Sequence, residues 1–160
     1  MNVIVIDDEA AVRNTIIKLL ADNFPEINVV ASAATIEEGF LRITEKKPDL
    51  LFLDIELPDG LGFDLLRRFD RVDFRIIFIT GHQEYALAAI KVSALDYILK
   101  PIDLTELSNA VEKARDVINL EEEQIKLSAL SENLKEKRNL KRIILRTGDS
   151  LQLVQINDII

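Results

Sequence analysis

Residues 50–60 of the chain read LLFLDIELPDG, which is the most informative segment for the fold. It opens with four consecutive apolar residues, which is typical of a strand buried on both faces of a parallel sheet. Asp54 follows the apolar run at once, and Pro58, Asp59 and Gly60 are residue types that favour a tight turn. The stretch therefore predicts a buried strand that ends in a carboxylate and is followed by a turn.

Other apolar runs of strand length lie on either side of this one, at residues 3–6, 29–31, 76–79 and 97–99. Amphipathic segments with helical spacing alternate with them, at residues 9–23, 36–45, 63–69, 84–92 and from Leu104 onward. Thr35 with Glu38, and Asp103 with Glu106, have the spacing of helix-capping pairs. The repeated alternation predicts an α/β domain with a five-stranded, doubly wound parallel sheet.

Beyond Leu104 the helical pattern continues unusually far. No glycine or proline occurs between Pro101 and Gly148, so one extended helix of about 30 residues is expected. Apolar residues recur along it at three- and four-residue steps, among them Leu120, Leu127, Leu130 and Leu134. Gln124 and Ser131 stand where a coiled coil would carry apolar residues, so a dimerising helix and a simple linker are both open.

From Arg142 the apolar pattern changes to a period of two, and Gly148-Asp149 separates two alternating runs. This pattern predicts a short β-hairpin tail. Because about 20 residues cannot form a core of their own, we expect the chain to stop just inside a second domain. The predicted organisation is a domain over residues 1–119, a helical linker over 120–140 and the start of a further domain over 141–160.

The composition excludes several classes of protein. With no cysteine and one histidine, the 160 residues cannot form disulfides, thiolate metal sites or multi-histidine zinc sites. No apolar run approaches the about 20 residues that cross a bilayer, and the start of the chain has no signal-peptide pattern. The net charge of −8 arises within residues 1–119, which argues against a nucleic-acid-binding surface there. A basic cluster over residues 135–146 is interpreted as a solvated helix end and strand edge.

Ligands of doubly wound sheets bind beyond the carboxyl ends of the strands, so polar residues at those ends are informative. In chain order they are Asp7, Asp8 and Glu9; Asp54 and Glu56; Thr80, Gly81 and His82; and Lys100. Taken singly, each of these residues has a structural alternative. Asp8 could be a helix N-cap, Thr80 could be an ordinary strand residue, and Lys100 could be a surface lysine. Together, the carboxylates would repel one another unless a cation intervened, and oxygen donors suit Mg²⁺.

These residues, in this order, resemble the receiver domain of two-component response regulators over residues 1 to about 119. The resemblance rests on the acidic pair Asp7-Asp8, on Asp54, on Thr80 and on Lys100-Pro101, each after its own strand. It implies a flavodoxin-like sheet with strand order 2-1-3-4-5. Residues 142–160 resemble the opening of a LytTR-type DNA-binding domain.

The resemblance implies that Asp54 is the phospho-acceptor and takes a phosphoryl group from a phosphohistidine of a sensor histidine kinase. It also implies a Mg²⁺ cofactor. Asp8, Asp54 and the backbone carbonyl of Glu56 would bind the ion directly, and Asp7 would hold it through water.

The remaining site residues are also assigned by the resemblance. Lys100 would pair with one phosphoryl oxygen and the Thr80 hydroxyl would donate to another. Thr80 and Tyr97 would form the switch, with Tyr97 alternatively a half-buried strand aromatic. His82 would flank the path of a hydrolytic water opposite Glu56, and Gly81 would leave the entrance open to phosphodonors.

The expected function is that of a cytoplasmic response regulator that switches a C-terminal transcription output. We expect no enzyme activity beyond self-phosphorylation and self-dephosphorylation, no membrane partner, and DNA contact only through the rest of the output domain. Self-association through residues 104–160 is also expected. The alternative is a phosphorylation-dependent interaction or dimerisation module without DNA output. An aspartyl phosphohydrolase of the haloacid dehalogenase class does not fit, because its nucleophile lies on the first strand.

Overall fold

The structure is a computed structural model of the whole chain and describes residues 1–139, 142–147 and 150–155. It divides into two compact units, Met1–Ile118 and Asn119–Ile160. No helix of the described ranges is long and apolar enough to span a membrane.

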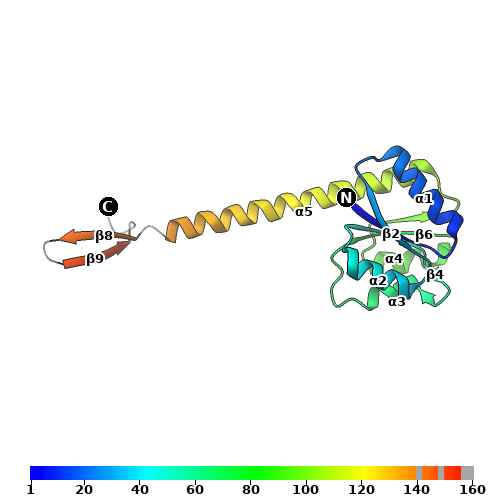
Figure 1. Cartoon of the computed structure of the whole chain (residues 1–160), viewed down its shortest axis with the longest axis horizontal. Coiled ribbons are helices and arrows are strands. Elements are labelled where there is room, and N and C mark those ends of the chain that lie inside the picture. Colours follow the sequence, from blue (N-terminus) through cyan, green and yellow to red (C-terminus); the bar gives the residue numbers. More distant parts are fainter. Residues whose placement is uncertain (140–141, 148–149, 156–160) are drawn as a thin grey trace. The chain divides into compact units, whose positions relative to one another are not determined.

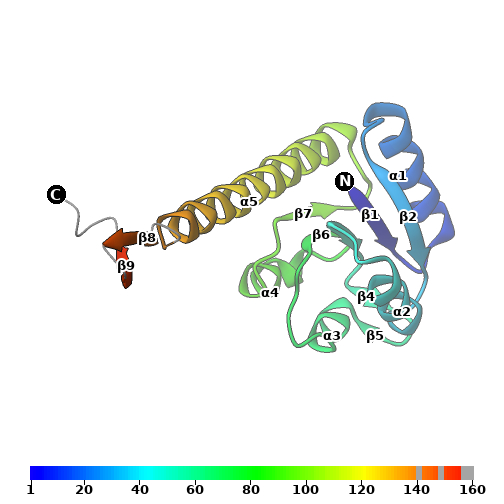
Figure 2. The ribbon, with the colours of Figure 1, turned by 60° about the vertical axis from the view of Figure 1, so that its left-hand side comes forward.

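The first unit is built on one parallel sheet (Figure 1). Its strands are β1 (Asn2–Ile6), β2 (Asn28–Ala33), β3 (Leu50–Leu53), β6 (Arg75–Thr80) and β7 (Asp96–Leu99). They lie in the order β2-β1-β3-β6-β7, which is 2-1-3-4-5 when only these five strands are counted (Figure 2). The predicted fold class is thus confirmed. The four residues of β3 are all buried at the centre of the sheet, as their apolar run predicts.

Helices cover both faces of this sheet. They are α1 (Ala10–Asn23), α2 (Ile36–Lys46), α3 (Gly62–Arg67), α4 (Ala86–Lys91), preceded by a 3₁₀ turn η1 (Gln83–Tyr85), and α5 (Leu104–Asn139). On one face Val3 and Val5 pack with residues of α1 and of the first turns of α5. On the other, Ile4 and Ile6 pack with residues of α2, α3 and α4. Successive side chains of β1 therefore point to opposite faces of the sheet and pack into two separate apolar layers.

The turn after Asp54 is more structured than the sequence predicts. Two short strands, β4 (Glu56–Leu57) and β5 (Gly60–Leu61), pair in an antiparallel ladder around it. Asp59, within the turn, accepts hydrogen bonds from the backbone N–H groups of Ile36 and Glu37 at 2.8 and 3.1 Å. Burial opposes its charge, but these two donors outweigh that effect and lower the pKa of Asp59. The turn is thereby tied to the start of α2.

The expected capping residues do cap their helices. The Thr35 hydroxyl accepts a hydrogen bond from the N–H of Glu38 at 3.2 Å at the start of α2. Asp103 accepts from the N–H groups of Thr105 and Glu106 at 2.9 and 3.1 Å at the start of α5. Both helices therefore begin where their capping signals predict.

Gly62 is the residue that allows the turn to approach β3 closely. Its N–H donates to the carbonyl of Ile55 at 2.7 Å, and a Cβ added at Gly62 would lie 2.5 Å from the backbone oxygen of Asp54. We predict that Gly62→Ala lowers the free energy of unfolding by about 1–3 kcal/mol, because backbone must shift to relieve the clash. Gly81→Ala is the control, since no atom lies within 4 Å of a Cβ there. Urea unfolding of both variants checks this, and equal losses would contradict it.

The second unit contains the end of α5 and a hairpin. α5 is one helix of 36 residues, in agreement with the predicted extended helix. β8 (Arg142–Thr147) and β9 (Ser150–Gln155) pair in an antiparallel ladder, with Arg142 opposite Gln155. The predicted turn residues Gly148 and Asp149, and the end of the chain from Ile156, lie outside the described residues.

Candidate functional site

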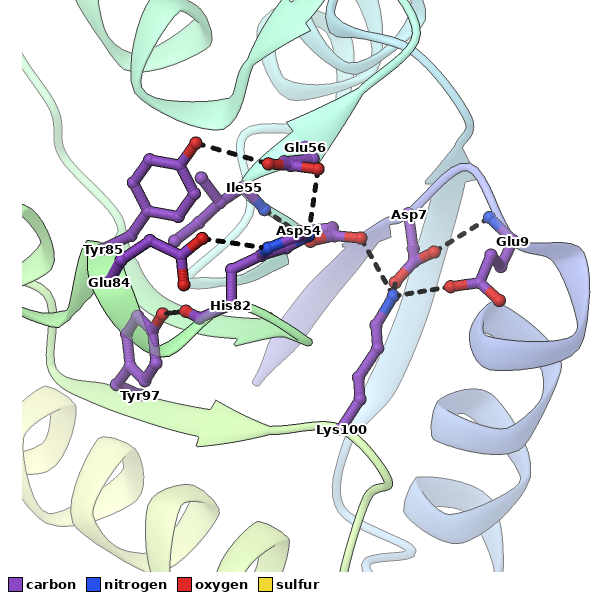
Figure 3. A network of polar contacts seen from close by, with 10 residues as sticks. All are labelled: Asp7, Glu9, Asp54, Ile55, Glu56, His82, Glu84, Tyr85, Tyr97 and Lys100. Carbon is purple, nitrogen blue, oxygen red and sulfur yellow. Dashed lines mark hydrogen bonds and ion pairs between the residues drawn. The ribbon is translucent and has the colours of Figure 1, made fainter.

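Polar residues from four strands meet at the carboxyl edge of the parallel sheet. The register places Ile6 of β1 beside Leu53 of β3, so Asp7 and Asp54, which follow them, come out side by side. Thr80 ends β6 beside Leu99 of β7, and Lys100 follows it. Asp7, Asp54 and Thr80 are the buried polar residues of the described chain. Parallel pairing alone thus gathers Asp7, Asp54 and Lys100 at one edge of the sheet (Figure 3).

Lys100 joins the carboxylates of this edge. Its Nζ lies 2.8 Å from Asp7 Oδ2, 2.9 Å from Asp54 Oδ2 and 3.0 Å from Glu9 Oε1 (Figure 3). Burial opposes the charge of the ammonium, but these carboxylates outweigh burial and raise the pKa of Lys100. The peptide bond between Lys100 and Pro101 is cis. Lys100 is therefore a fixed positive charge between two buried acids.

Asp7 is the most strongly desolvated acid of the site. Burial is the main cause that raises its pKa, and the nearby charge of Asp54 acts in the same direction. The Lys100 ammonium and the N–H of Glu9, which donates to Asp7 Oδ1 at 2.9 Å, oppose this rise. Asp7 Oδ2 accepts no well-directed hydrogen bond within the described residues. The carboxylate of Asp7 thus carries a charge that its surroundings only partly compensate.

Asp54 is held at both of its carboxylate oxygens. Oδ1 accepts a hydrogen bond from the N–H of Ile55 at 2.6 Å, and Oδ2 is paired with Lys100. The backbone N–H of Asp54 donates to the carbonyl of Ile6 at 2.9 Å, which continues the β1–β3 ladder to this residue. Its carboxylate therefore has one defined orientation at the edge of the sheet.

One group of acids in the described chain is close enough to hold a metal ion. It comprises Asp7, Asp8 and Glu9, whose ligand atoms lie within 4.8 Å of one another. Asp54 is outside this group and is connected to Asp7 through Lys100. The helix N-cap position is taken by Glu9 and not by Asp8, so the N-cap alternative for Asp8 is wrong. Glu9 was named among the polar residues that follow the strands, but the predicted site gave it no role.

The two residues predicted as the switch lie on the neighbouring strands β6 and β7, where Thr80 is opposite Leu99 and Tyr97 is opposite Phe78. Thr80 is wholly buried, and its hydroxyl makes no hydrogen bond within the ranges that the structure describes. Tyr97 is half-buried, its ring lies 6.5 Å from that of Phe78, and its hydroxyl donates to the backbone carbonyl of His82. Burial is the main cause that raises the pKa of Tyr97. The Thr80 hydroxyl is thus buried without a partner at the end of β6, and Tyr97 of the next strand contacts the loop that follows β6.

A second polar network lies beside Asp54 and was only partly predicted. His82 Nε2 lies 2.9 Å from Glu56 Oε2, and His82 Nδ1 lies 3.2 Å from Glu84 Oε1. The Tyr85 hydroxyl donates to Glu56 Oε1 at 3.3 Å (Figure 3). The sequence singled out Glu56 and His82 but not Glu84 and Tyr85. A Cβ at Gly81 would meet open space.

The chain matches the model of a known protein family. The family model described as the response regulator receiver domain matches residues 3–112 of the chain. These residues include the acidic triplet, Asp54, Thr80 and Lys100.

Curated relatives and solved structures agree with this match. The chain is 38% identical over 116 residues to the sensory transduction protein LytT of Enterococcus faecalis, covering 71% of this chain and 48% of that protein. It is 31% identical to LytT of Bacillus subtilis, covering 100% of this chain and 64% of that protein. The chain thus spans about half to two thirds of the length of these relatives.

Among solved structures, the REC domain of AraT, a response regulator from Geobacillus stearothermophilus, has a TM-score of 0.69 and 32% identity. The match covers 76% of this chain and 97% of that one. The response regulatory domain of mrkE from Klebsiella pneumoniae has a TM-score of 0.68 and 28% identity, covering 73% of this chain and 97% of that one.

Proposed function

The chain belongs to the response regulator receiver domain family, and from this premise we propose that it acts as a phosphorylation-controlled switch whose acceptor is Asp54. The observation that carries the proposal is the triad of Asp7, Asp54 and Lys100, in which the partly buried ammonium of Lys100 lies 2.8 Å from the buried carboxylate of Asp7 and 2.9 Å from that of Asp54. Such a site is suited to hold a phosphoryl group, whose transfer depends mainly on positioning and charge neutralisation.

In the proposed reaction, a carboxylate oxygen of Asp54 attacks the phosphorus of a phosphohistidine on a sensor histidine kinase. The P–O bond to Asp54 forms, the P–N bond breaks and its electron pair leaves with the imidazole nitrogen, giving an acyl phosphate. Lys100 already contacts Asp54 and would pair with a phosphoryl oxygen. The unsatisfied hydroxyl of Thr80 is a donor available for another.

The residues present fit a divalent cation at this site, and we propose Mg²⁺. Asp7, Asp8 and Glu9 supply the oxygen donors that this ion prefers, and Asp7 carries an incompletely compensated buried charge. When bound, the ion would neutralise charge on the transferring phosphoryl group. Asp54, which shares the Lys100 ammonium with Asp7, and the Glu56 carbonyl remain proposed ligands.

We predict that Asp7→Asn raises the melting temperature of the metal-free protein at pH 7 by a few degrees and removes the rise that Mg²⁺ causes in the wild type. Burial raises the pKa of Asp7, so ionisation of Asp7 destabilises the folded state at pH values above that pKa. The gap between variant and wild type should therefore shrink as the pH falls through a value above 3.8. Calorimetry from pH 3 to pH 8 measures this, and a variant less stable than the wild type at pH 7 would contradict it.

The conformational change on phosphorylation would begin at Thr80 and reach the surface through Tyr97. Movement of the Thr80 hydroxyl toward a phosphoryl group would change the loop at Gly81 and His82, whose carbonyl accepts from Tyr97. Rotation of the Tyr97 ring would then alter the surface of β7, α4 and α5. Glu56 and His82, which contact each other beside Asp54, would set the access of hydrolytic water.

The wider role is also a proposal. The LytT relatives support a two-component regulator whose C-terminal output controls transcription through a LytTR-type domain that begins near Arg142. We propose a cytoplasmic location, with activity limited to self-phosphorylation and self-dephosphorylation. DNA would be contacted by parts of the output domain other than this chain, and copies of the chain would associate through residues 104–160.

The proposal is tested by measuring intact mass after incubation with acetyl phosphate. The wild type is expected to gain one phosphoryl group in the presence of Mg²⁺ and none after chelation with EDTA. A protein that stays unmodified with Mg²⁺, or that is modified equally in EDTA, would contradict the proposal.

A further inference from the structure

A groove lies between α3 and α4, on the face of the sheet that these two helices share (Figure 2). Its most buried lining residues are Phe63, Leu66 and Ile76, which are between 4% and 7% exposed and form an apolar floor. The volume of this α3–α4 groove is about 370 Å³, within the range of about 300–1,000 Å³ that is usual for ligand sites. The groove is therefore large enough to receive side chains of a partner.

Two exposed valines extend the apolar floor to the surface. Val72, in the loop before β6, is 40% exposed, and Val92, at the end of α4, is 38% exposed. Both line the α3–α4 groove. Single exposed apolar side chains are common on protein surfaces, but these two adjoin a hollow that is already apolar. Apolar side chains that filled the hollow would remove this surface from water, which favours binding.

The charged residues that line the α3–α4 groove are both cations. Arg67 is in the last turn of α3 and Lys91 in the last turn of α4, where the helix dipole favours positive charge. Arg67 pairs with Asp64 at 2.8 Å, whereas Lys91 makes no ion pair within the described residues. No acid is among the described residues that line the groove, although the net charge of −8 arises within residues 1–119. The groove is thus a basic spot on an acidic domain and favours an acidic partner.

The elements around the α3–α4 groove restrict the kind of segment that can bind there. β6, which supplies Ile76, is paired with β3 on one side and with β7 on the other. None of the described lining residues therefore belongs to a strand edge that could accept a further strand. A partner must be held by its side chains, which is how an amphipathic helix binds in a groove.

We propose that the α3–α4 groove binds an acidic amphipathic helix of a partner protein. Apolar residues one turn apart on that helix would enter the hollow above Phe63 and Leu66. Carboxylates that flank them would pair with Lys91 and Arg67. The surface is small, so the binding should be weak, and salt should weaken it further by screening the charges. The inference does not depend on the proposed role of Asp54.

The first test uses a fluorescently labelled peptide of about 15 residues, long enough to form a helix, with leucines at i, i+4 and i+7 and glutamates on both flanks. Fluorescence anisotropy measures its binding to the whole chain. A second peptide with lysine in place of each glutamate should bind at least about tenfold more weakly. Non-specific attraction to the acidic domain would give the opposite preference. Equal binding of the two peptides, or no binding of the acidic one, would contradict the proposal.

The Lys91→Glu variant tests whether the charge of the α3–α4 groove attracts the peptide. It sets a carboxylate against the glutamates and should weaken binding of the acidic peptide at least about tenfold. The matched control is Lys18→Glu, because Lys18 is exposed on α1, which packs on the other face of the sheet. This control should keep the affinity within about twofold. Equal losses in the two variants would show that overall charge, and not the groove, attracts the peptide.

The Val92→Gln variant tests the apolar part of the groove. Val92 is partly exposed, so the fold should persist, while binding of the acidic peptide should weaken by about threefold or more. The control is Leu87→Gln, since Leu87 is 75% exposed on α4 but does not line the groove. Binding should be unchanged in this control. An equal loss in Leu87→Gln would place the peptide on another face of α4 and overturn the proposal.

Amide chemical shifts measured by NMR give the location of the bound peptide directly. Titration of the whole chain with the acidic peptide should shift the signals of Leu66, Ala88, Lys91 and Val92 and leave those of α1 in place. Shifts confined to other elements would contradict the proposal. If Lys91→Glu changes the mass of the chain itself in light scattering and leaves peptide binding unaltered, the occupant is a second copy and the proposal is wrong.

Discussion

In the Asp54→Asn variant, phosphate incorporation from acetyl phosphate is expected to fall to background while the fold persists. The asparagine oxygen can still accept the hydrogen bond that Ile55 N–H donates to Asp54 Oδ1 at 2.6 Å. What is lost is the nucleophilic carboxylate and its ion pair with Lys100. Mass spectrometry with and without the phosphodonor measures incorporation, and circular dichroism checks the fold.

A matched control shows whether the effect on phosphorylation is specific to Asp54 or follows from the loss of any acidic residue. Asp73→Asn removes a carboxylate that is exposed and paired with Arg71 at 2.6 Å, in the loop before β6. This variant should be phosphorylated like the wild type. Phosphate that persists in Asp54→Asn, or disappears equally in Asp73→Asn, would refute the assignment of Asp54.

The Lys100→Met variant is expected to lose about 3 kcal/mol of unfolding free energy without metal. Methionine keeps an unbranched apolar stem but removes the ammonium, which leaves Asp7 and Asp54 as unpaired buried charges. Removing one partner of a buried ion pair is strongly destabilising for this reason. Urea unfolding measures the loss. We also expect the variant to retain metal binding and to lose most of the phosphorylation-dependent switching.

Lys113→Met is the control for this effect. Lys113 pairs with Asp96 at 2.9 Å, but both side chains are substantially exposed, so the loss should stay within about 1 kcal/mol. Adding Asp7→Asn to Lys100→Met should recover part of the stability, because one stranded charge is removed. Equal losses for the two lysine variants would show that the triad does not stabilise the fold as argued.

Much of the fold follows from local sequence pattern. The continuous apolar run of β3 predicts a strand buried on both faces, and a parallel sheet then requires Asp54 to emerge at its carboxyl edge. The same reasoning brings Asp7 and Lys100 to that edge, where the structure places them within 3 Å of each other. The positions of these residues directly after their strands were sufficient for this prediction, because the carboxyl ends of parallel strands lie at the same edge of the sheet.

Contacts that depend on loop geometry could not be predicted in this way. Tyr85 reaches Glu56 across 29 positions of sequence, and Asp59 caps α2 from a turn that lies after β3. Neither pair has a characteristic spacing, since the partners meet only after the sheet has formed. Glu84 was likewise read as part of an ordinary amphipathic helix, whereas it lies in a 3₁₀ turn beside His82.

The grouping of the acids differs from expectation for a similar reason. The acidic triplet forms a compact cluster because Asp7, Asp8 and Glu9 are adjacent in sequence, while Asp54 turns toward Lys100. Which carboxylates share a cation depends on side-chain rotamers at the strand ends, and the apolar pattern of the strands carries no information on those rotamers.

The central claim is that Asp54, and no other acid of this edge, receives the phosphoryl group. The most direct measurement is borohydride reduction of the phosphorylated protein followed by peptide mass spectrometry, because reduction of an aspartyl phosphate leaves homoserine at the modified position. Homoserine is expected at position 54 in Mg²⁺-containing samples and is expected to be absent after EDTA treatment. Homoserine at position 7 or 8, with position 54 unchanged, would contradict it.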